Sequence, residues 1–264
     1  MKILLIVFFI IINLNAYNLT LNNKEALIIA NKIWQNEGAG KRKYLVWWNK
    51  GEEFASCGIG HFIWFTKDKP MWFFHTFPDM LKFITKEGAK PPKWLTPNTP
   101  CVWNSYKEWQ YAKKHNTKKM QELTNFLNNT KALQAKYMVH RLNKAYNKLL
   151  NYAKTPEQRK KIEYNFKNLL FKNSKVDMQG AYCLIDYTNF KGDGTLESER
   201  YNGYGWGLYQ VLLHMDSKNK NKYKAFADSV RFILDRLIKV SPPERRLYRF
   251  RKGWFNRIKT YENF

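Results

Sequence analysis

The residues best suited to chemistry lie between Glu37 and His61, where the chain reads EGAGKRKYLVWWNKGEEFASCGIGH. Glu37 is followed by Gly38, the residue type that most often comes just after the end of a helix. On a helix, Glu37 would share a face with Ile33 and Trp34. Apolar surroundings and the negative end of the helix dipole both disfavour a charged carboxylate. We therefore expect Glu37 to hold a proton and donate it, as the general acid of glycosidic-bond cleavage does.

A helix and a β-hairpin are expected to position these residues. Apolar residues recur at helical spacing between 23 and 36, which predicts a helix with Glu37 in its last turn. Segments 44–48 and 54–64 are rich in aromatic and β-branched residues and flank the turn residues 49–51, which predicts a hairpin. Gly58 and Gly60 leave one strand face bare, a pattern typical of close approach by backbone or ligand.

Two stretches carry a resemblance to a known family. The run SCGIGHF at 56–62, placed after the NEG sequence at 36–38, resembles the phage-type lysozymes. In that family a Glu ending the first helix is followed by a small hairpin with an Asp, then a Thr, then TIGIGH. The C-terminal stretch SPPERRLYRFRKGWFNRIKTY at 241–261 is similar to the closing helices of the same family. The run GLYQV at 207–211 is similar to the GLMQV run of lytic transglycosylases.

The resemblance implies roles for individual residues. Glu37 matches the general acid, Ser56 the Thr that holds the attacking water, and His61 the histidine that closes the motif. Lys50 falls at the spacing of the family's Asp. The second carboxylate is therefore expected to be Glu52, with Glu53 as the alternative. If neither reaches the cleft, a water-only or intramolecular transglycosylase route would remain.

Further polar and aromatic residues are candidates for substrate binding. We expect the substrate to contact Trp48, His61, Asn189, Tyr201 and Gln210. Several rings in the dense aromatic run at 62–77 either stack on sugars or cover the core beneath the hairpin. An alternative acid would be one of the two Glu residues upstream of GLYQV, Glu197 and Glu199.

The N-terminus indicates export. Met1-Lys2, an apolar run and Asn-Leu-Asn-Ala predict a signal peptide at 1–16, cleaved after Ala16, in a periplasmic or secreted protein. The apolar run is shorter than the roughly 20 residues that span a bilayer, and no other stretch is long enough, so no stable membrane insertion is expected. An uncleaved N-terminal anchor is the alternative.

Charge and composition favour a wall polymer as the partner. The chain of 264 residues has 46 basic and 21 acidic residues and a net charge of +25, which implies a polyanionic partner. With 44% hydrophobic residues it is globular. For an exported protein the natural polyanions are the cell wall, with its peptide carboxylates, and anionic envelope polymers.

Metal and cofactor chemistry is not expected. The five His residues show no metal-ligand spacing, and no phosphate-binding glycine loop occurs. Cys57, Cys101 and Cys183 allow one disulfide and demand none. A nucleophilic role for Cys57 is the weaker alternative to a buried thiol.

The expected fold is mostly α (α+β) and lysozyme-like, with two helical lobes and one small β-hairpin beside the cleft. Residues 17–264 would form one monomeric domain, with a hairpin lobe at about 17–90, a proline-rich connector, and a helical lobe at about 105–264. Capping signals and apolar periodicity predict helices at 78–87, 106–128 with a break near Asn116, 130–153, from 156, 178–190, from about 203, 221–240, and after 244.

The favoured function is a hydrolase of the glycan strand of peptidoglycan. A lytic transglycosylase, which needs Glu37 alone, is the first alternative. A non-catalytic wall-binding protein, in which Glu37 is an ordinary surface residue, is the second. Specific nucleic-acid binding is disfavoured because the chain carries an export signal, although its basic and aromatic composition would suit it.

Overall fold

Helix α1 (Asn23–Gly38) leads into the candidate site and is fixed at both ends. At its start, the Asn22 side chain accepts from the Glu25 amide at 3.0 Å, and the Glu25 carboxylate accepts from the Asn22 amide at 2.9 Å. At its end, Ala39 is left-handed with φ of 49°. The prediction that Glu37 lies in the last helical turn is confirmed.

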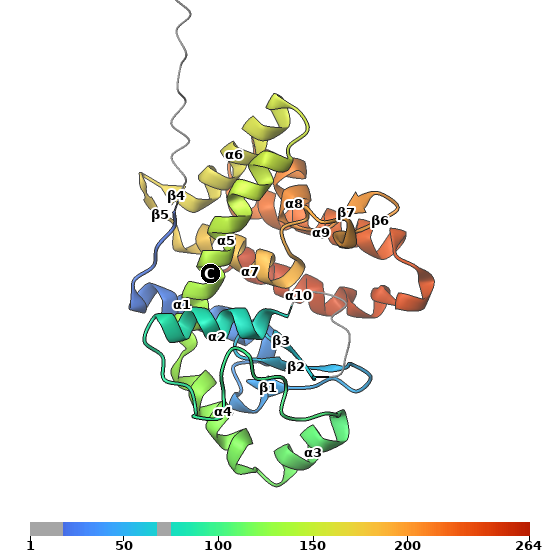
Figure 1. Cartoon of the computed structure of the whole chain (residues 1–264). Coiled ribbons are helices and arrows are strands. Elements are labelled where there is room, and N and C mark those ends of the chain that lie inside the picture. Colours follow the sequence, from blue (N-terminus) through green and yellow to red (C-terminus); the bar gives the residue numbers. More distant parts are fainter. Residues whose placement is uncertain (1–17, 68–74) are drawn as a thin grey trace, which may run out of the picture.

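The computed structural model describes residues 18–67 and 75–264, drawn in colour in Figure 1. The expected signal peptide lies outside the described residues, as does the middle of the aromatic run at 62–77. Within the described residues the fold is mostly helical with small antiparallel sheets, as the expected α+β class requires.

The other α-helices are α2 (Thr76–Lys86), α3 (Tyr106–Lys114), α4 (Lys118–Asn129), α5 (Lys131–Tyr152), α6 (Pro156–Leu170), α7 (Met178–Lys191), α8 (Leu208–His214), α9 (Lys222–Val240) and α10 (Arg251–Glu262). The strands are β1 (Val46–Trp47), β2 (Phe54–Cys57), β3 (Phe62–Phe65), β4 (Phe171–Lys172), β5 (Lys175–Val176), β6 (Arg200–Tyr201) and β7 (Tyr204–Gly205). Short 3-10 turns are η1 (Arg42–Tyr44), η2 (Glu197–Glu199), η3 (Pro243–Arg245) and η4 (Leu247–Phe250).

The predicted strand at 54–64 is in fact two strands. β1, β2 and β3 form one antiparallel sheet in that order, with Ser56 paired to Trp47 on one side and Ile63 on the other. The chain reverses between β2 and β3 because Gly58 and His61 adopt positive φ values of 78° and 49°. The two glycines therefore form a turn and do not lie within a strand.

The expectation of a single small hairpin was wrong. Two further antiparallel pairs, β4–β5 and β6–β7, occur among the described residues. Asn202 and Gly203, both with positive φ, connect β6 to β7, and this Asn-Gly pair is a strong sequence signal for a tight hairpin. The β6–β7 hairpin follows α7 and precedes α8, close to the candidate cleft.

The long helix α5 runs between the lower and upper parts of the molecule in Figure 1. Helices α3 and α4 lie below, beside the hairpin sheet, where the Trp109 ring is 5.4 Å from the Trp47 ring and Arg42 donates to Asn125. The lower lobe therefore includes α3 and α4. Helix α5 connects this lower lobe to the helices above it (Figure 1).

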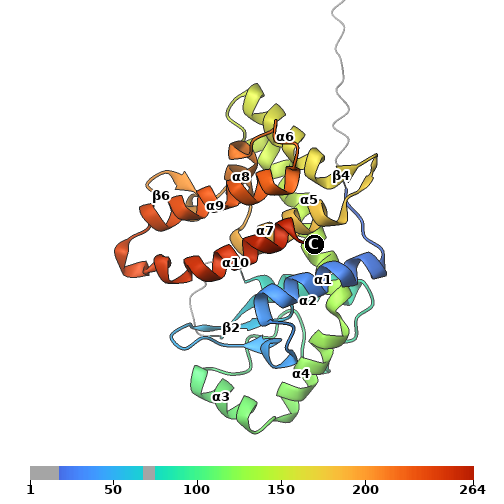
Figure 2. The same ribbon diagram turned by 180° about the vertical axis from the view of Figure 1, so that it is seen from behind.

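Helix α7 is the centre of the upper lobe. Residues 180–188 are all buried, and α7 is packed against α1, α5, α6, α8, α9 and α10. Figure 2 shows α9 and α10 running side by side across the back of this lobe. No helix in the described part of the chain is both long and apolar enough to cross a membrane.

Candidate active-site cleft

A cleft of about 870 Å³ opens between the two lobes. Its walls come from the β2–β3 turn, β3, helices α2 and α5, the end of α7 and the loop that follows α7. His61 and Asn189 both line this cleft, as expected for substrate-binding residues. Their backbones are 128 positions apart, so only the tertiary fold brings them together.

Asn189 fastens the β2–β3 turn to the upper lobe. Its Nδ2 donates to the Gly60 carbonyl oxygen at 3.1 Å, and its Oδ1 accepts from Arg141 Nη1 at 3.2 Å. A Cβ on Gly60 would lie 2.3 Å from Cε of Met138 in α5 and 3.1 Å from that same Oδ1. The glycine is therefore required by the close approach of the turn to α7 and α5, as the sequence pattern indicates.

Glu37 lies beside His61, next to the ring nitrogen Nδ1. Its Oε2 is 3.7 Å from His61 Nδ1, and the Glu37 side chain is 17% exposed. The other ring nitrogen of His61, Nε2, lies 3.1 Å from the Tyr44 carbonyl oxygen. The imidazole is thus held between the backbone of the lower lobe and the Glu37 carboxyl group, with one side open to the cleft.

Glu37 was expected to have apolar surroundings, but the structure gives it charged ones. Arg257, on the last helix, donates from Nη2 to Glu37 Oε1 at 2.9 Å. Helix position alone predicted contact with Ile33 and Trp34, but the Arg257 side chain of α10 brings a guanidinium to the carboxyl group. A guanidinium attracts a carboxylate, so the apolar argument for a protonated Glu37 no longer applies.

Arg257 itself is bound mainly to Asp186. Its Nε and Nη2 donate to the two oxygens of Asp186, each at 2.8 Å. Tyr261 donates to Asp186 Oδ2 at 2.7 Å, and Asn36 Nδ2 lies 3.3 Å from Oδ1. Burial would lower the pKa of Arg257, but the charges of Asp186 and Glu37 outweigh burial, and the pKa is raised.

Sequence reasoning missed this network, although one signal was present. Asp186 lies in the apolar run GAYCLIDYTNF of α7 and is fully buried. A buried acidic residue almost always has a cationic or hydrogen-bonding partner. That signal predicts some buried cation, but nothing in the sequence identifies Arg257 as the partner.

Apart from His61, the lower-lobe residues expected at the site do not line the cleft. Ser56 is buried in the centre strand β2. Glu52 lies in the turn after β1, where its Oε2 accepts from Asn49 Nδ2 at 3.1 Å, and burial raises its pKa against the hydrogen bonds from Asn49. Trp48 is only 2% exposed and donates to the Glu52 carbonyl oxygen at 2.7 Å. The structure therefore places Trp48 in the core.

Tyr201 and Gln210 support the far wall of the cleft. The Tyr201 ring packs 4.8 Å from that of Trp206, which lines the cleft. Gln210 accepts from the Gly207 amide at 2.9 Å and donates to the Gly194 carbonyl oxygen at 3.0 Å. Gln210 therefore holds the loop after α7 against the start of α8.

Two further carboxyl groups line the cleft in that loop, Asp193 and Glu199. Glu199 Oε2 accepts from the Gly194 amide at 2.8 Å. Burial first, and then the charge of Asp193, raise the pKa of Glu199. Glu197, the other upstream acid, points away with an 88% exposed side chain beside Arg200. Of the two alternative acids, only Glu199 reaches the cleft.

Lys191, the last residue of α7, adds a titratable amine to the cleft. Its Nζ lies 3.6 Å from the centroid of the Trp254 ring. Burial, followed by the charge of Arg257, lowers the pKa of Lys191 to about 7, while Glu37 acts in the opposite direction. A proton can therefore be exchanged at this position near neutral pH.

The thiols and potential metal ligands form no additional centre. Cys57, Cys101 and Cys183 are all buried and unbridged. Across residues 18–67 and 75–264, no group of three or more His, Cys, Asp or Glu side chains is placed to hold a metal ion.

Comparisons with known proteins add no family assignment. Searches with protein-family models, against curated proteins and against solved structures found no match to this chain.

Proposed function

We propose that this protein cleaves the glycan strand of peptidoglycan and has a lysozyme-like fold, with Glu37 as general acid. The observation that carries the proposal is the position of one carboxyl group. Glu37 ends the first helix, and its Oε2 lies 3.7 Å from Nδ1 of His61, a residue that lines the 870 Å³ cleft. A cleft of this size between two lobes suits a segment of a polysaccharide chain.

The hydrogen bonds of the network leave one oxygen of Glu37 unbound by Arg257. Glu37 and Asp186 share one guanidinium, that of Arg257. Asp186 is fully buried and bonded at both oxygens, whereas Oε2 of Glu37 faces His61. Glu37 would protonate the leaving oxygen of the glycosidic bond.

The second carboxylate decides between the two reaction types. In the hydrolase, Glu52 or Glu53 would stabilise positive charge or activate water, and Ser56 would position that water. Glu52 is bound within its own turn and is absent from the cleft wall described above. The second candidate function is therefore a lytic transglycosylase, which needs only one acid. Glu199 is the alternative acid, because burial has already raised its pKa in the cleft.

The test is incubation of purified sacculi with the wild type, Glu37→Gln, Glu199→Gln and, as a matched control, Glu197→Gln. We expect Glu37→Gln to release soluble muropeptides about 10² to 10⁴ times more slowly, because it lacks the transferable proton. Glu197→Gln should match the wild type because its side chain is 88% exposed. Undiminished release by Glu37→Gln would refute Glu37 as the acid. Loss with Glu199→Gln alone would transfer that role to Glu199.

Mass analysis of the products separates the reaction types. Reducing ends indicate hydrolysis, and anhydro ends indicate transglycosylation. A wild type that sediments with sacculi but releases nothing would be a wall-binding protein, and Glu37→Gln would then bind equally well.

A further inference from the structure

A second hollow lies on the lower lobe, away from the candidate cleft. It has a volume of about 560 Å³ and is formed by Trp103 and by residues of α3 and the start of α4. We call this hollow the α3–α4 groove. Its lining residues are Trp103, Lys107, Glu108, Tyr111, Ala112, Thr117, Lys118 and Lys119, and none of them lines the cleft.

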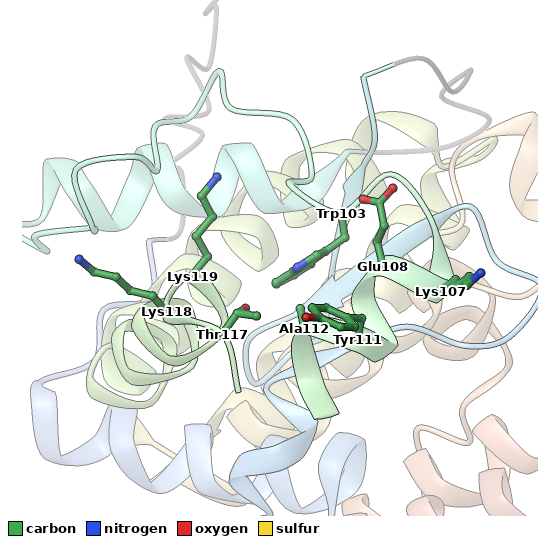
Figure 3. A pocket seen from close by; sticks show the side chains of 8 residues that line it. All are labelled: Trp103, Lys107, Glu108, Tyr111, Ala112, Thr117, Lys118 and Lys119. Atoms are coloured by element: carbon green, nitrogen blue, oxygen red, sulfur yellow. The ribbon is translucent and has the colours of Figure 1, made fainter. Parts of the chain in front are cut away.

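The floor of the groove is made of two aromatic rings and a methyl group. In Figure 3 the Trp103 ring lies beside Ala112 and Tyr111. Trp103 is 5% exposed and is fixed from behind by the Trp64 ring, 6.2 Å away. Tyr111 is 63% exposed. Tyr111 therefore offers an exposed apolar ring to a ligand, while the buried Trp103 ring closes the floor of the groove.

The rim of the groove is positively charged. Lys118 and Lys119 extend on one side of the rings and Lys107 on the other (Figure 3). All three are exposed and form no salt bridge within the described residues. The one carboxylate, Glu108, accepts from the Asn104 amide at 2.9 Å at the start of α3. The groove therefore complements an anionic ligand with a flat face.

We propose that the α3–α4 groove is a second binding site for peptidoglycan. A sugar ring lies against Tyr111, above the floor that Trp103 closes, and the carboxylates of the attached peptide pair with Lys118 and Lys119. The identity of the polymer rests on the proposed function, while the preference for a carboxylate-bearing, ring-containing ligand rests on the groove alone. Two sites on one polymer raise the local substrate concentration at the cleft.

The binding test uses the full chain in the Glu37→Gln background, so that the sacculi remain intact. Sedimentation with purified sacculi at physiological salt gives an apparent Kd for each variant. The groove variants are Tyr111→Ala and Lys118→Glu/Lys119→Glu. The control for Tyr111 is Tyr248→Ala, a 67% exposed tyrosine in η4. Thermal melting of every variant confirms that it is folded.

A second control isolates charge. Lys218→Glu/Lys220→Glu alters two exposed lysines in the loop before α9. Each double variant lowers the net charge of +25 by four, to +21. General attraction to a polyanion predicts equal weakening by both. A specific site predicts about a tenfold higher Kd for the groove variants only, which corresponds to losing one well-placed contact.

Chemically amidated sacculi provide the third arm. Amidation neutralises the carboxylates of the sacculi, so the chain should bind them more weakly. Lys118→Glu/Lys119→Glu should then have the same Kd as its control. Equal Kd values for groove and control variants on native sacculi would overturn the inference. The inference would also be overturned if the groove variants lost affinity only for duplex DNA or only for an apolar peptide, and not for sacculi. Muropeptide release by the wild type is scored separately, so the proposed function and the groove can fail independently.

Discussion

Arg257 Nη2 donates to Glu37 Oε1 at 2.9 Å, joining two residues 220 positions apart in the chain. Glu37 ends the first helix and Arg257 lies in the last, so the contact forms only when both ends of the chain have folded. The same guanidinium binds Asp186 on the central helix α7. The candidate acid is therefore positioned by three helices at once, and this dependence makes the network testable through stability.

Replacing Arg257 should be far more costly than replacing Arg251, another arginine of α10. Each donates two hydrogen bonds to one Asp, Arg257 to buried Asp186 and Arg251 to Asp235, whose side chain is 45% exposed. Arg257→Ala leaves a buried carboxylate unpaired, and we expect it to lower the free energy of unfolding by about 3–5 kcal/mol. Arg251→Ala should cost far less, because its ion pair with Asp235 is exposed to solvent. Urea denaturation of both variants measures the difference, and similar losses would contradict the network.

The pH dependence of stability should reveal Glu199. Burial raises the pKa of Glu199 above its ordinary value of 4.5. The folded chain therefore binds this proton more tightly than the unfolded chain does. The resulting stability is complete below pH 4.5 and is lost as pH rises through the raised pKa. Glu199→Gln should thus gain in stability relative to the wild type between pH 4 and pH 7.

The control for this titration is Glu197→Gln, measured by chemical denaturation at the same pH values. Its side chain is 88% exposed, so this variant shows the effect of removing a solvent-exposed carboxyl group from the same loop. A stability difference for Glu199→Gln that does not change with pH would mean that Glu199 is not held in a partly desolvated position.

Substitution by alanine should destabilise the protein at Gly180 and stabilise it at Gly253. A Cβ on Gly180 would lie 1.7 Å from the Leu169 carbonyl oxygen, where α7 meets the backbone of α6. Because backbone cannot move aside cheaply, we expect Gly180→Ala to cost about 3 kcal/mol. A Cβ on Gly253 in α10 meets nothing within 4 Å. Gly253→Ala should stabilise by about 0.5–1 kcal/mol, through helix propensity. Thermal unfolding of the two variants provides the comparison.

Thiol labelling should find three protected cysteines. All three are buried and unbridged, and burial raises the pKa of Cys101 to about 12. Because the thiolate is the reactive form, the native chain should react slowly with a disulfide reagent. In guanidinium chloride, without reductant, three thiols should react. A count of one would indicate a disulfide and contradict this arrangement.

Local sequence signals predicted most helices of this protein. Ser105 caps α3 as expected, and the predicted break near Asn116, where φ is 46°, separates α3 from α4. Helices α5, α6, α7 and α9 also begin within a residue or two of their predicted starts. These features depend on caps, turns and apolar spacing over a few residues, which the sequence displays directly.

Local patterns failed where a turn or packing decided the outcome. The strand predicted at 54–64 splits because Gly58 and His61 reverse the chain. The last helix begins at Arg251, not directly after Glu244, because two 3-10 turns and the left-handed Arg246 come between them. Trp48, the residue after β1, belongs to the core, where its indole nitrogen donates to the Glu52 carbonyl oxygen.

The sequence by itself determined that Glu37 ends a helix and that a glycine-bearing turn follows it, because both depend on neighbouring residues. Only the tertiary structure decided which groups surround Glu37. Arg257 and Asp186 reach it from helices far along the chain, and Asn189 meets Gly60 through the packing of α7 against the turn. The interaction between two buried charges depends on their distance in space. For residues far apart in the chain, their positions in the sequence give no information about that distance.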